Sequence, residues 1–189
     1  LLLTGAGAGG YYYISNIDWN QHKDKIAAEF SDITGKRIIF DGPAHLTLLH
    51  SPNLRAEDIK IYNPGEDLDE PLAQIKSLTA DLALGALING DFDVKMMTLE
   101  EPDIRLEVME DGRLNWEGTL TDDQRANLET MQITLDSVMI EKAKLNLIDV
   151  ARDINLKLEN LNAEVIAQSI FGPYRIEGTY IKDNNPEGF

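Results

Sequence analysis

Three histidines, His22, His45 and His50, are the residues best suited to metal or acid–base chemistry. His45 and His50 are five positions apart in a segment that alternates like a β-strand, so their side chains point to opposite faces of a sheet and form a poor metal-binding pair. His22 belongs to an expected helix, away from the other two. The histidines are therefore interpreted as structural residues and not as metal ligands or catalytic groups.

Acidic residues come close together in two places, Asp67 with Asp69 and Glu70, and Asp91 with Asp93. Carboxylate oxygens of this kind bind calcium, but neither group has the spacing of an EF-hand loop or of a nonapeptide repeat. Both groups are better interpreted as solvated loops, and no metal is predicted.

Covalent and cofactor chemistry have no support in the sequence. The chain has no cysteine, which excludes disulfides, thiolate zinc sites and cysteine nucleophiles. Its serines are not set in a nucleophile elbow. The closely spaced glycines Gly5, Gly7, Gly9 and Gly10 lie in an apolar run, whereas a dinucleotide-binding fingerprint lies between a strand and a helix. We predict no catalytic residue, no cofactor and no enzymatic activity.

The charge of the chain excludes a further class of partner. The 189 residues include 33 acidic and 17 basic ones, which gives a net charge of −16. A surface this acidic repels a phosphate backbone, and no cluster of basic and aromatic residues offsets the repulsion. Nucleic acid is therefore not an expected partner, and the length and composition are those of a globular protein with a real core.

The first 14 residues, LLLTGAGAGGYYYI, are uncharged and end in the three tyrosines 11–13. Three interpretations compete: the end of a transmembrane helix, the remnant of a signal peptide, or a buried segment. Tyrosines concentrate where a membrane meets water, and here they run directly into the next helix. The sequence therefore favours residues 1–14 as the end of a transmembrane anchor.

Residues 15–35 are predicted to form one amphipathic helix that caps the end of a sheet. Ile17, His22, Ile26, Phe30 and Ile33 recur at near-helical spacing. Asp18 is the expected N-cap, and Gly35 is placed to end the helix in the left-handed conformation.

From residue 36 to residue 189 the period changes to two, which predicts a mainly β domain with an antiparallel sheet. Antiparallel neighbours are expected because most connections are short turns. Residues 117–130 do not alternate and are interpreted as a loop or short helix. The predicted strands are 36–41, 45–50, 57–63, 75–84, 91–99, 103–110, 113–117, 132–135, 138–150, 153–158, 161–167 and 174–182.

Alternation also predicts which side chains share a face. One helix of this length cannot cover such a sheet, so the shared face must either fold on itself, meet a partner or hold an apolar ligand. The residues predicted to line this face are Leu82, Leu84, Phe92, Val94, Met96, Ile104, Leu106, Val108, Leu145, Leu147, Ile154, Leu156, Leu158 and Ile176.

Several short motifs, in their order along the chain, resemble the AsmA-like family of Gram-negative inner-membrane proteins. The first are Asp18-Trp19-Asn20, Thr34-Gly35 and Asn63-Pro64; the central ones are Leu87-Ile88-Asn89-Gly90, Ile104-Arg105-Leu106 and the Asp111-Gly112-Arg113-Leu114-Asn115-Trp116 segment; Phe171-Gly172-Pro173-Tyr174 follows later. Each motif is weak alone, but the series is similar to the family's order over essentially the whole chain.

The resemblance implies that the antiparallel β-sheet is elongated and curved, and that the chain belongs to a single-pass inner-membrane protein whose bulk lies in the periplasm. It also implies that the apolar face of the sheet binds phospholipids and conducts them towards the outer membrane, and that the chain is the N-terminal part of a longer protein. The edge strand 174–182 would then pair with a further strand or with a partner. The alternative is a non-enzymatic, membrane-tethered scaffold that associates with a membrane protein complex.

Overall fold

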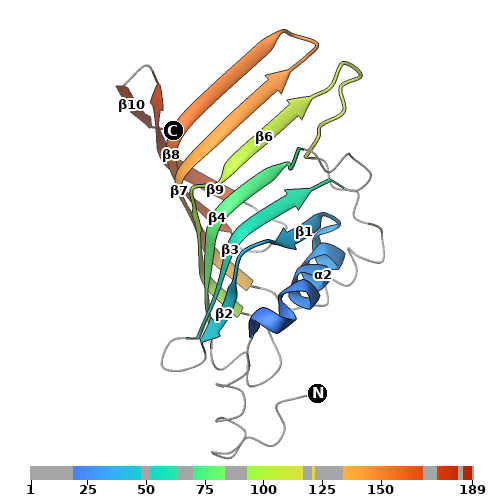
Figure 1. Cartoon of the computed structure of the whole chain (residues 1–189). Coiled ribbons are helices and arrows are strands. Elements are labelled where there is room, and N and C mark those ends of the chain that lie inside the picture. Colours follow the sequence, from blue (N-terminus) through green and yellow to red (C-terminus); the bar gives the residue numbers. More distant parts are fainter. Residues whose placement is uncertain are drawn as a thin grey trace, which may run out of the picture.

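The computed structural model contains one mixed β-sheet of ten strands with a helix packed against it (Figure 1). It describes residues 19–47, 52–63, 70–83, 93–116, 121, 134–167, 174–182 and 185–188. This architecture confirms the mainly β fold class, with a helix followed by a long sheet. The expected anchor, residues 1–14, lies outside the described residues. Within the described part of the chain, no helix has the length and apolar character needed to cross a bilayer.

The helical segment consists of a 3-10 turn, η1 (Trp19–His22), and an α-helix, α2 (Lys23–Thr34). It ends as the sequence predicts: Gly35 has a φ of 65°, and its N–H donates to the Ser31 carbonyl at 2.9 Å. The Ser31 hydroxyl in turn accepts a hydrogen bond from the backbone N–H of Ile38 at 2.9 Å. The end of the helix is thereby tied to the first strand. The expected N-cap, Asp18, lies outside the described residues.

The strands follow the predicted segments with a few differences in their ends. The strands predicted at 132–135 and 138–150 correspond to one strand over residues 134–149, and those predicted at 153–158 and 161–167 correspond to one strand over residues 154–167. Of the strand predicted at 113–117, the described residues 113–116 contribute only an isolated bridge between Leu114 and Val108. The strands are β1 (Arg37–Phe40), β2 (Ala44–Thr47), β3 (Asn53–Tyr62), β4 (Ala73–Leu82), β5 (Asp93–Glu100), β6 (Asp103–Val108), β7 (Thr134–Asp149), β8 (Ile154–Ala167), β9 (Tyr174–Lys182) and β10 (Asn185–Gly188).

The sheet order is β1-β3-β4-β5-β7-β8-β9-β10, with β2 also on β3 and β6 between β4 and β7. The expectation of a purely antiparallel sheet is wrong at one place, because β7 runs parallel to both β5 and β6. The connection of residues 109–133 is long enough for the crossover that parallel pairing requires. β5 and β6 pair with successive halves of β7, so they act as one strand interrupted at Glu101 and Pro102.

The last strand, β10, is not among the predicted strands. It pairs with residues 179–182 of β9. The edge strand predicted at 174–182 is therefore partly covered by the chain's own β10. The proline of β10, Pro186, is tolerated because an edge strand leaves one side without ladder partners.

A line of backbone irregularities crosses the sheet about halfway along the strands. Asp58 in β3, Glu101 between β5 and β6, Lys142 in β7 and Asn160 in β8 have φ values of 48°, 48°, 53° and 52°. The pairing of β7 with β8 shifts register near Lys142, and that of β8 with β9 shifts near Asn160. Bulges of this kind bend a strand. The strands accordingly bend there, and α2 lies on the inner side of the bend (Figure 1).

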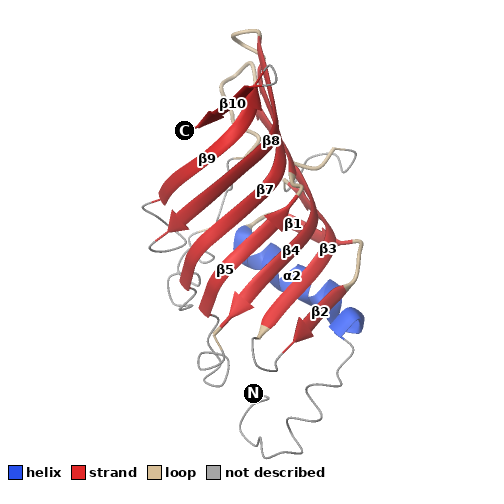
Figure 2. Ribbon diagram, turned by 90° about the vertical axis from the view of Figure 1, so that its left-hand side faces the viewer, coloured by secondary structure: helices blue, strands red, loops and turns tan. Residues whose placement is uncertain are grey.

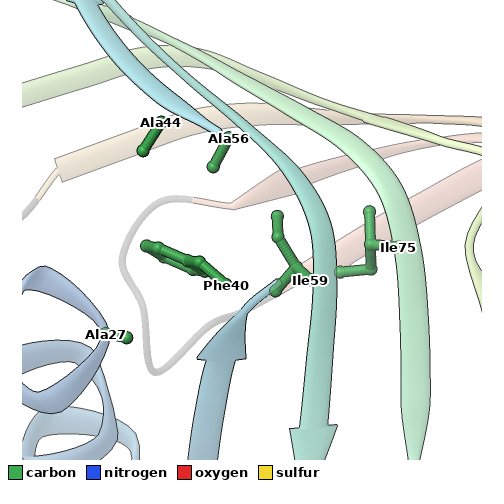
Figure 3. Close-up of a cluster of buried hydrophobic side chains, with 6 residues drawn as sticks. All are labelled: Ala27, Phe40, Ala44, Ala56, Ile59 and Ile75. Carbon is green, nitrogen blue, oxygen red and sulfur yellow. The ribbon is translucent and has the colours of Figure 1, made fainter. Parts of the chain in front are cut away.

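The closed core lies between α2 and the first strands. Figure 3 shows Ala27 of the helix facing Phe40, Ala44, Ala56, Ile59 and Ile75, all of them buried. We call the side of the sheet that carries these residues the inner face and the opposite side the outer face. In a view turned by 90° about the vertical axis, α2 lies behind the first strands and does not extend behind β7, β8 and β9 (Figure 2).

Candidate apolar binding face

The inner face continues from the closed core onto strands β6, β7 and β8. Ile61 of β3 packs against the core and is the pairing partner of Ala73 in β4. Ala73 is in turn the pairing partner of Ile104 in β6. Directly paired side chains lie on the same face of a sheet, so Ile104 belongs to the inner face. The rows that follow from this register are Ile104, Leu145 and Leu158; Leu106, Leu147 and Leu156; and Val108 and Ile154, on either side of Asp149.

Beyond the bend, the inner face carries two further apolar rows. Leu78 and Leu99 pair with each other and pack against the core, so they lie on the inner face. The residues paired with them on neighbouring strands therefore lie on the inner face as well. The rows are Leu78, Leu99, Ile140 and Ala163; and Ala80, Met97, Val138, Val165 and Ile176. We call the residues of all five rows, Asp149 excepted, the apolar face.

Nine of the residues predicted for a common face lie in these rows: Ile104, Leu106, Val108, Leu145, Leu147, Ile154, Leu156, Leu158 and Ile176. Leu82 and Val94 pair with each other beyond a register shift at the ends of β4 and β5. Leu84 and Phe92 lie outside the described residues.

The face predicted for Met96 is wrong. Met96 pairs with Asp81 and Ser137, and it is the next residue, Met97, that shares a face with Leu99. The prediction extended even-numbered alternation through β5 and β6, but the strand shifts by one residue at Glu101. Met96 therefore lies on the outer face.

The same shift explains the residues that the sequence reasoning missed. Met97, Leu99, Val138, Ile140 and Val165 have the opposite parity to the predicted residues of the same or adjoining strands. The signal was nevertheless in the sequence, because apolar positions change from even to odd within residues 138–147 and again within 154–165. Read as a bulge, such a change places both halves on one face.

The apolar face is closed at one end and open at the other. The side chains beneath α2 are buried, whereas Leu156, Ile154 and Ile176 remain 37, 46 and 54% exposed. Isolated exposed apolar residues are common, but a contiguous apolar patch usually marks a binding surface. Here the exposed residues continue the rows of a real core.

A protein-family model matches the part of the chain that forms this sheet. The model of the AsmA family matches residues 9–182. The chain belongs to the AsmA family. No curated protein matches it. The matched range contains β1 to β9, and therefore all five rows of the apolar face.

The Asn-Trp motif of this AsmA-family chain braces one end of the face. Asn115 is hydrogen-bonded to the backbone of β6. Its backbone N–H donates to the Glu107 carbonyl at 2.9 Å, and its side-chain Oδ1 accepts from the Glu107 N–H at 2.8 Å. Its Nδ2 donates to the Arg105 carbonyl at 3.0 Å. The Asn63 amide donates to the carbonyl of Asn115. These bonds tie the segment after β6 to the end of β3, which is a structural role.

Only one charged side chain of the inner face is buried among the described residues. Asp149 lies between Val108 and Ile154, and its carboxylate accepts from the Arg152 guanidinium at 2.7 Å and from the Arg152 backbone N–H at 3.0 Å. The side-chain hydrogen bond from Arg152 is the main reason that the pKa of Asp149 lies below its ordinary value. The pair closes the β7–β8 hairpin at the end of the apolar rows.

The outer face is polar where the inner face is apolar. A shallow groove of about 570 Å³ follows the bend, with Lys60, Lys76, Lys142 and Lys144 alternating with acidic side chains. Lys60 pairs with Asp41 and Lys76 with Glu101, each at 2.7 Å. No group of three potential metal ligands occurs among the described residues. The groove combines opposite charges in similar number, as solvated strand surfaces do, and supports no chemistry.

Proposed function

We propose that the apolar face binds the acyl chains of phospholipids. In this proposal the chain is an inner-membrane-anchored periplasmic protein of envelope biogenesis that passes lipids towards the outer membrane. The observation that carries the proposal is the exposure of Ile154, Leu156 and Ile176 on a face whose other end is a closed core. Membership of the AsmA family is consistent with a lipid-related envelope function.

The chemistry of the face favours an apolar and adaptable ligand. Its rows consist of apolar side chains, and Asp149, the one acidic group that is buried among the described residues of this face, is already held by Arg152. Hydrophobic attraction is non-directional, so such a surface accepts flexible chains without reading their polar groups. The rows cross from strand to strand, which gives an acyl chain a continuous apolar path across the sheet.

The anchor and the compartment are part of the proposal. Residues 1–14 are uncharged, and their tyrosines suit the boundary between membrane and water. They precede η1, so an anchor there would place α2 and the closed end of the face near the membrane. The open end would then lie further along the sheet.

A pair of substitutions on neighbouring positions tests lipid binding. Leu156→Asp places a carboxylate in the apolar rows, where an acyl chain would have to desolvate it. Asn155→Asp adds the same charge one residue away, on the outer face with Glu107 and Ile148. Native mass spectrometry and solvent extraction of the purified proteins should find phospholipid on the wild type and on Asn155→Asp, and much less on Leu156→Asp.

A lipid-free wild-type monomer would contradict the proposal. It would favour the second candidate, a non-enzymatic membrane-tethered scaffold of a membrane protein complex. One observation supports that candidate: within the described residues, β10 covers only residues 179–182 of β9, and no strand pairs with the same side of residues 174–178. An open strand edge can pair with a strand of another protein.

A further inference from the structure

A narrow groove follows the free edge of the sheet at β1. β1 is the first strand in the sheet order, and β3 is its only pairing partner among the described strands, so one long side of β1 is open. α2 lies beside it (Figure 1). The space between the helix and the strand has a volume of about 350 Å³, and we call it the β1 groove. The helix lines it with Asp24, Ala28 and Asp32, and the strand with Ile38, Ile39 and Phe40.

Hydrogen bonds at both ends of the β1 groove hold α2 against β1 in an antiparallel arrangement. Near the start of the helix, Lys23 Nζ donates to the carbonyls of Asp41 and Gly42, each at 3.2 Å. Near its end, the Ser31 hydroxyl accepts from the Ile38 N–H at 2.9 Å. The helix rises about 12 Å from residue 23 to residue 31, and an extended strand rises about 10 Å from residue 38 to residue 41. The two elements therefore stay side by side along the groove.

The open side of β1 presents backbone groups that can pair with another strand. The Ile38 N–H points away from β3, towards the helix. The Asp41 N–H points the other way and donates to the Asp58 carbonyl of β3 at 3.0 Å. Because the backbone groups of alternate residues point to the same edge of a strand, the N–H and C=O of Phe40 and the C=O of Ile38 face away from β3. An edge of this kind can accept an added strand.

The helical wall of the groove determines which strand would fit. Asp24, Ala28 and Asp32 are spaced four residues apart, so they share one flank of α2, and all three are exposed. The two charged residues that the described chain contributes to the lining are thus both acidic, and they lie about 12 Å apart along the helix. In an extended strand, side chains four positions apart share a face and are about 13 Å apart. Two basic side chains at this spacing would meet the two carboxylates, with an apolar side chain between them on Ala28.

We propose that the β1 groove binds an extended segment of another protein as an added strand, and that this segment carries two basic residues four positions apart with an apolar residue midway between them. Charge disfavours the other occupants. A second copy of this chain, with a net charge of −16, would be repelled, and an anionic lipid headgroup would meet the same carboxylates. The β1 groove lies at the opposite edge of the sheet from β9 and β10, and it does not depend on lipid binding by the apolar face.

Designed peptides test the proposal on the complete chain. The probe is a fluorescently labelled peptide of sequence Ser-Lys-Thr-Val-Thr-Lys-Ser, and its control has glutamate in place of both lysines. Fluorescence anisotropy should detect binding of the lysine peptide and none of the glutamate peptide. Only one of the two alternating sets of peptide N–H groups would face β1. N-methylation of that set should therefore abolish binding, and N-methylation of the other set should leave it unchanged.

Charge reversal on the helix tests where the peptide lies. Asp24→Lys should weaken binding of the lysine peptide roughly tenfold, because it replaces an attraction with a repulsion of similar size. Glu110→Lys, at an exposed position after β6, makes the same change in net charge and should have little effect. The double variant Asp24→Lys, Asp32→Lys should prefer the glutamate peptide. Circular dichroism checks that each variant is folded, and hydrogen exchange should show that the peptide protects the Phe40 amide.

Three results would overturn the proposal. The first is failure of the lysine peptide to bind at millimolar concentration. The second is equal weakening by Asp24→Lys and Glu110→Lys, which would mean a general attraction to an acidic protein. The third is binding that neither set of N-methyl groups disturbs, which would mean that no strand is added. Lipid carried by the purified protein is measured separately, so this proposal and the lipid proposal can each fail alone.

Discussion

Ile176 offers the clearest separation of lipid binding from folding. It is the most exposed of the large apolar side chains of the inner face, at 54%, and it ends the row that starts at Ala80. Full burial of an isoleucine is worth about 1.5–3 kcal/mol, so an acyl chain that covers the exposed half contributes about 1 kcal/mol. Removing that contact should weaken lipid binding roughly fivefold.

Ile176→Thr is the suitable change. Threonine keeps the branched Cβ that strands favour, and an exposed site has little packing to lose, so the free energy of unfolding should change by less than about 0.5 kcal/mol. Binding can be followed by displacement of a fluorescent phospholipid analogue, and stability by urea unfolding. Arg175→Thr, on the outer face beside it, is the control and should bind lipid as the wild type does.

Two outcomes would refute this reasoning. Wild-type affinity in Ile176→Thr, with weaker binding in Arg175→Thr, would place the lipid on the outer face. A loss of several kcal/mol in unfolding free energy would mean that Ile176 is part of the folded core, so that its exposure is not available to a ligand.

Three further predictions concern the scaffold. Ile59→Ala, at a core position that is 2% exposed, should lower the unfolding free energy by about 2–5 kcal/mol in urea titration; a loss below 1 kcal/mol would contradict the closed core. Lys142→Gly should raise it by up to about 1 kcal/mol, because Lys142 has a φ of 53°, whereas Lys142→Val should lower it, and the reverse order would mean that no left-handed conformation is required. The pKa of Asp149 is lowered in the folded state, so the stability that it contributes is present above the unfolded pKa and lost as pH falls through the folded one. Asp149→Asn should therefore be less stable than wild type at pH 7 and equal to it near pH 2, and a constant difference would exclude this linkage.

Alternation within short segments was sufficient to predict most strands and the part of the apolar face that lies on β6, β7 and the first half of β8. A period of two was enough to predict that the apolar residues of each strand share one face. This holds for Ile104, Leu106, Leu145, Leu147 and their partners on β8. The end of the helix followed from Gly35, whose lack of a side chain permits a positive φ. These features are local, and local sequence determines them.

Long-range pairing was beyond the sequence reasoning. Short turns predict antiparallel neighbours, and nothing in residues 93–108 states that β5 and β6 both align with β7. Pro102 lacks an N–H and interrupts this strand, while its carbonyl still accepts from the Lys144 N–H at 2.8 Å. Sequence periodicity registers such an interruption as the end of one strand and the start of another, although the sheet continues through it.

The bend connects the fold to the proposed lipid site. In a straight β7, Val138 and Ile140 would face away from Leu145 and Leu147, because their positions differ in parity. The extra residue at Lys142 returns both halves to the inner face, and β3, β5–β6 and β8 make the same change at Asp58, Glu101 and Asn160. Since four non-glycine residues adopt a left-handed conformation along one line, the bend runs across the central strands from β3 to β8 and is not confined to one of them. Because of the bend, apolar side chains lie on the inner face on both sides of this line. The apolar face is therefore long enough to offer the open surface that the proposed lipid binding requires.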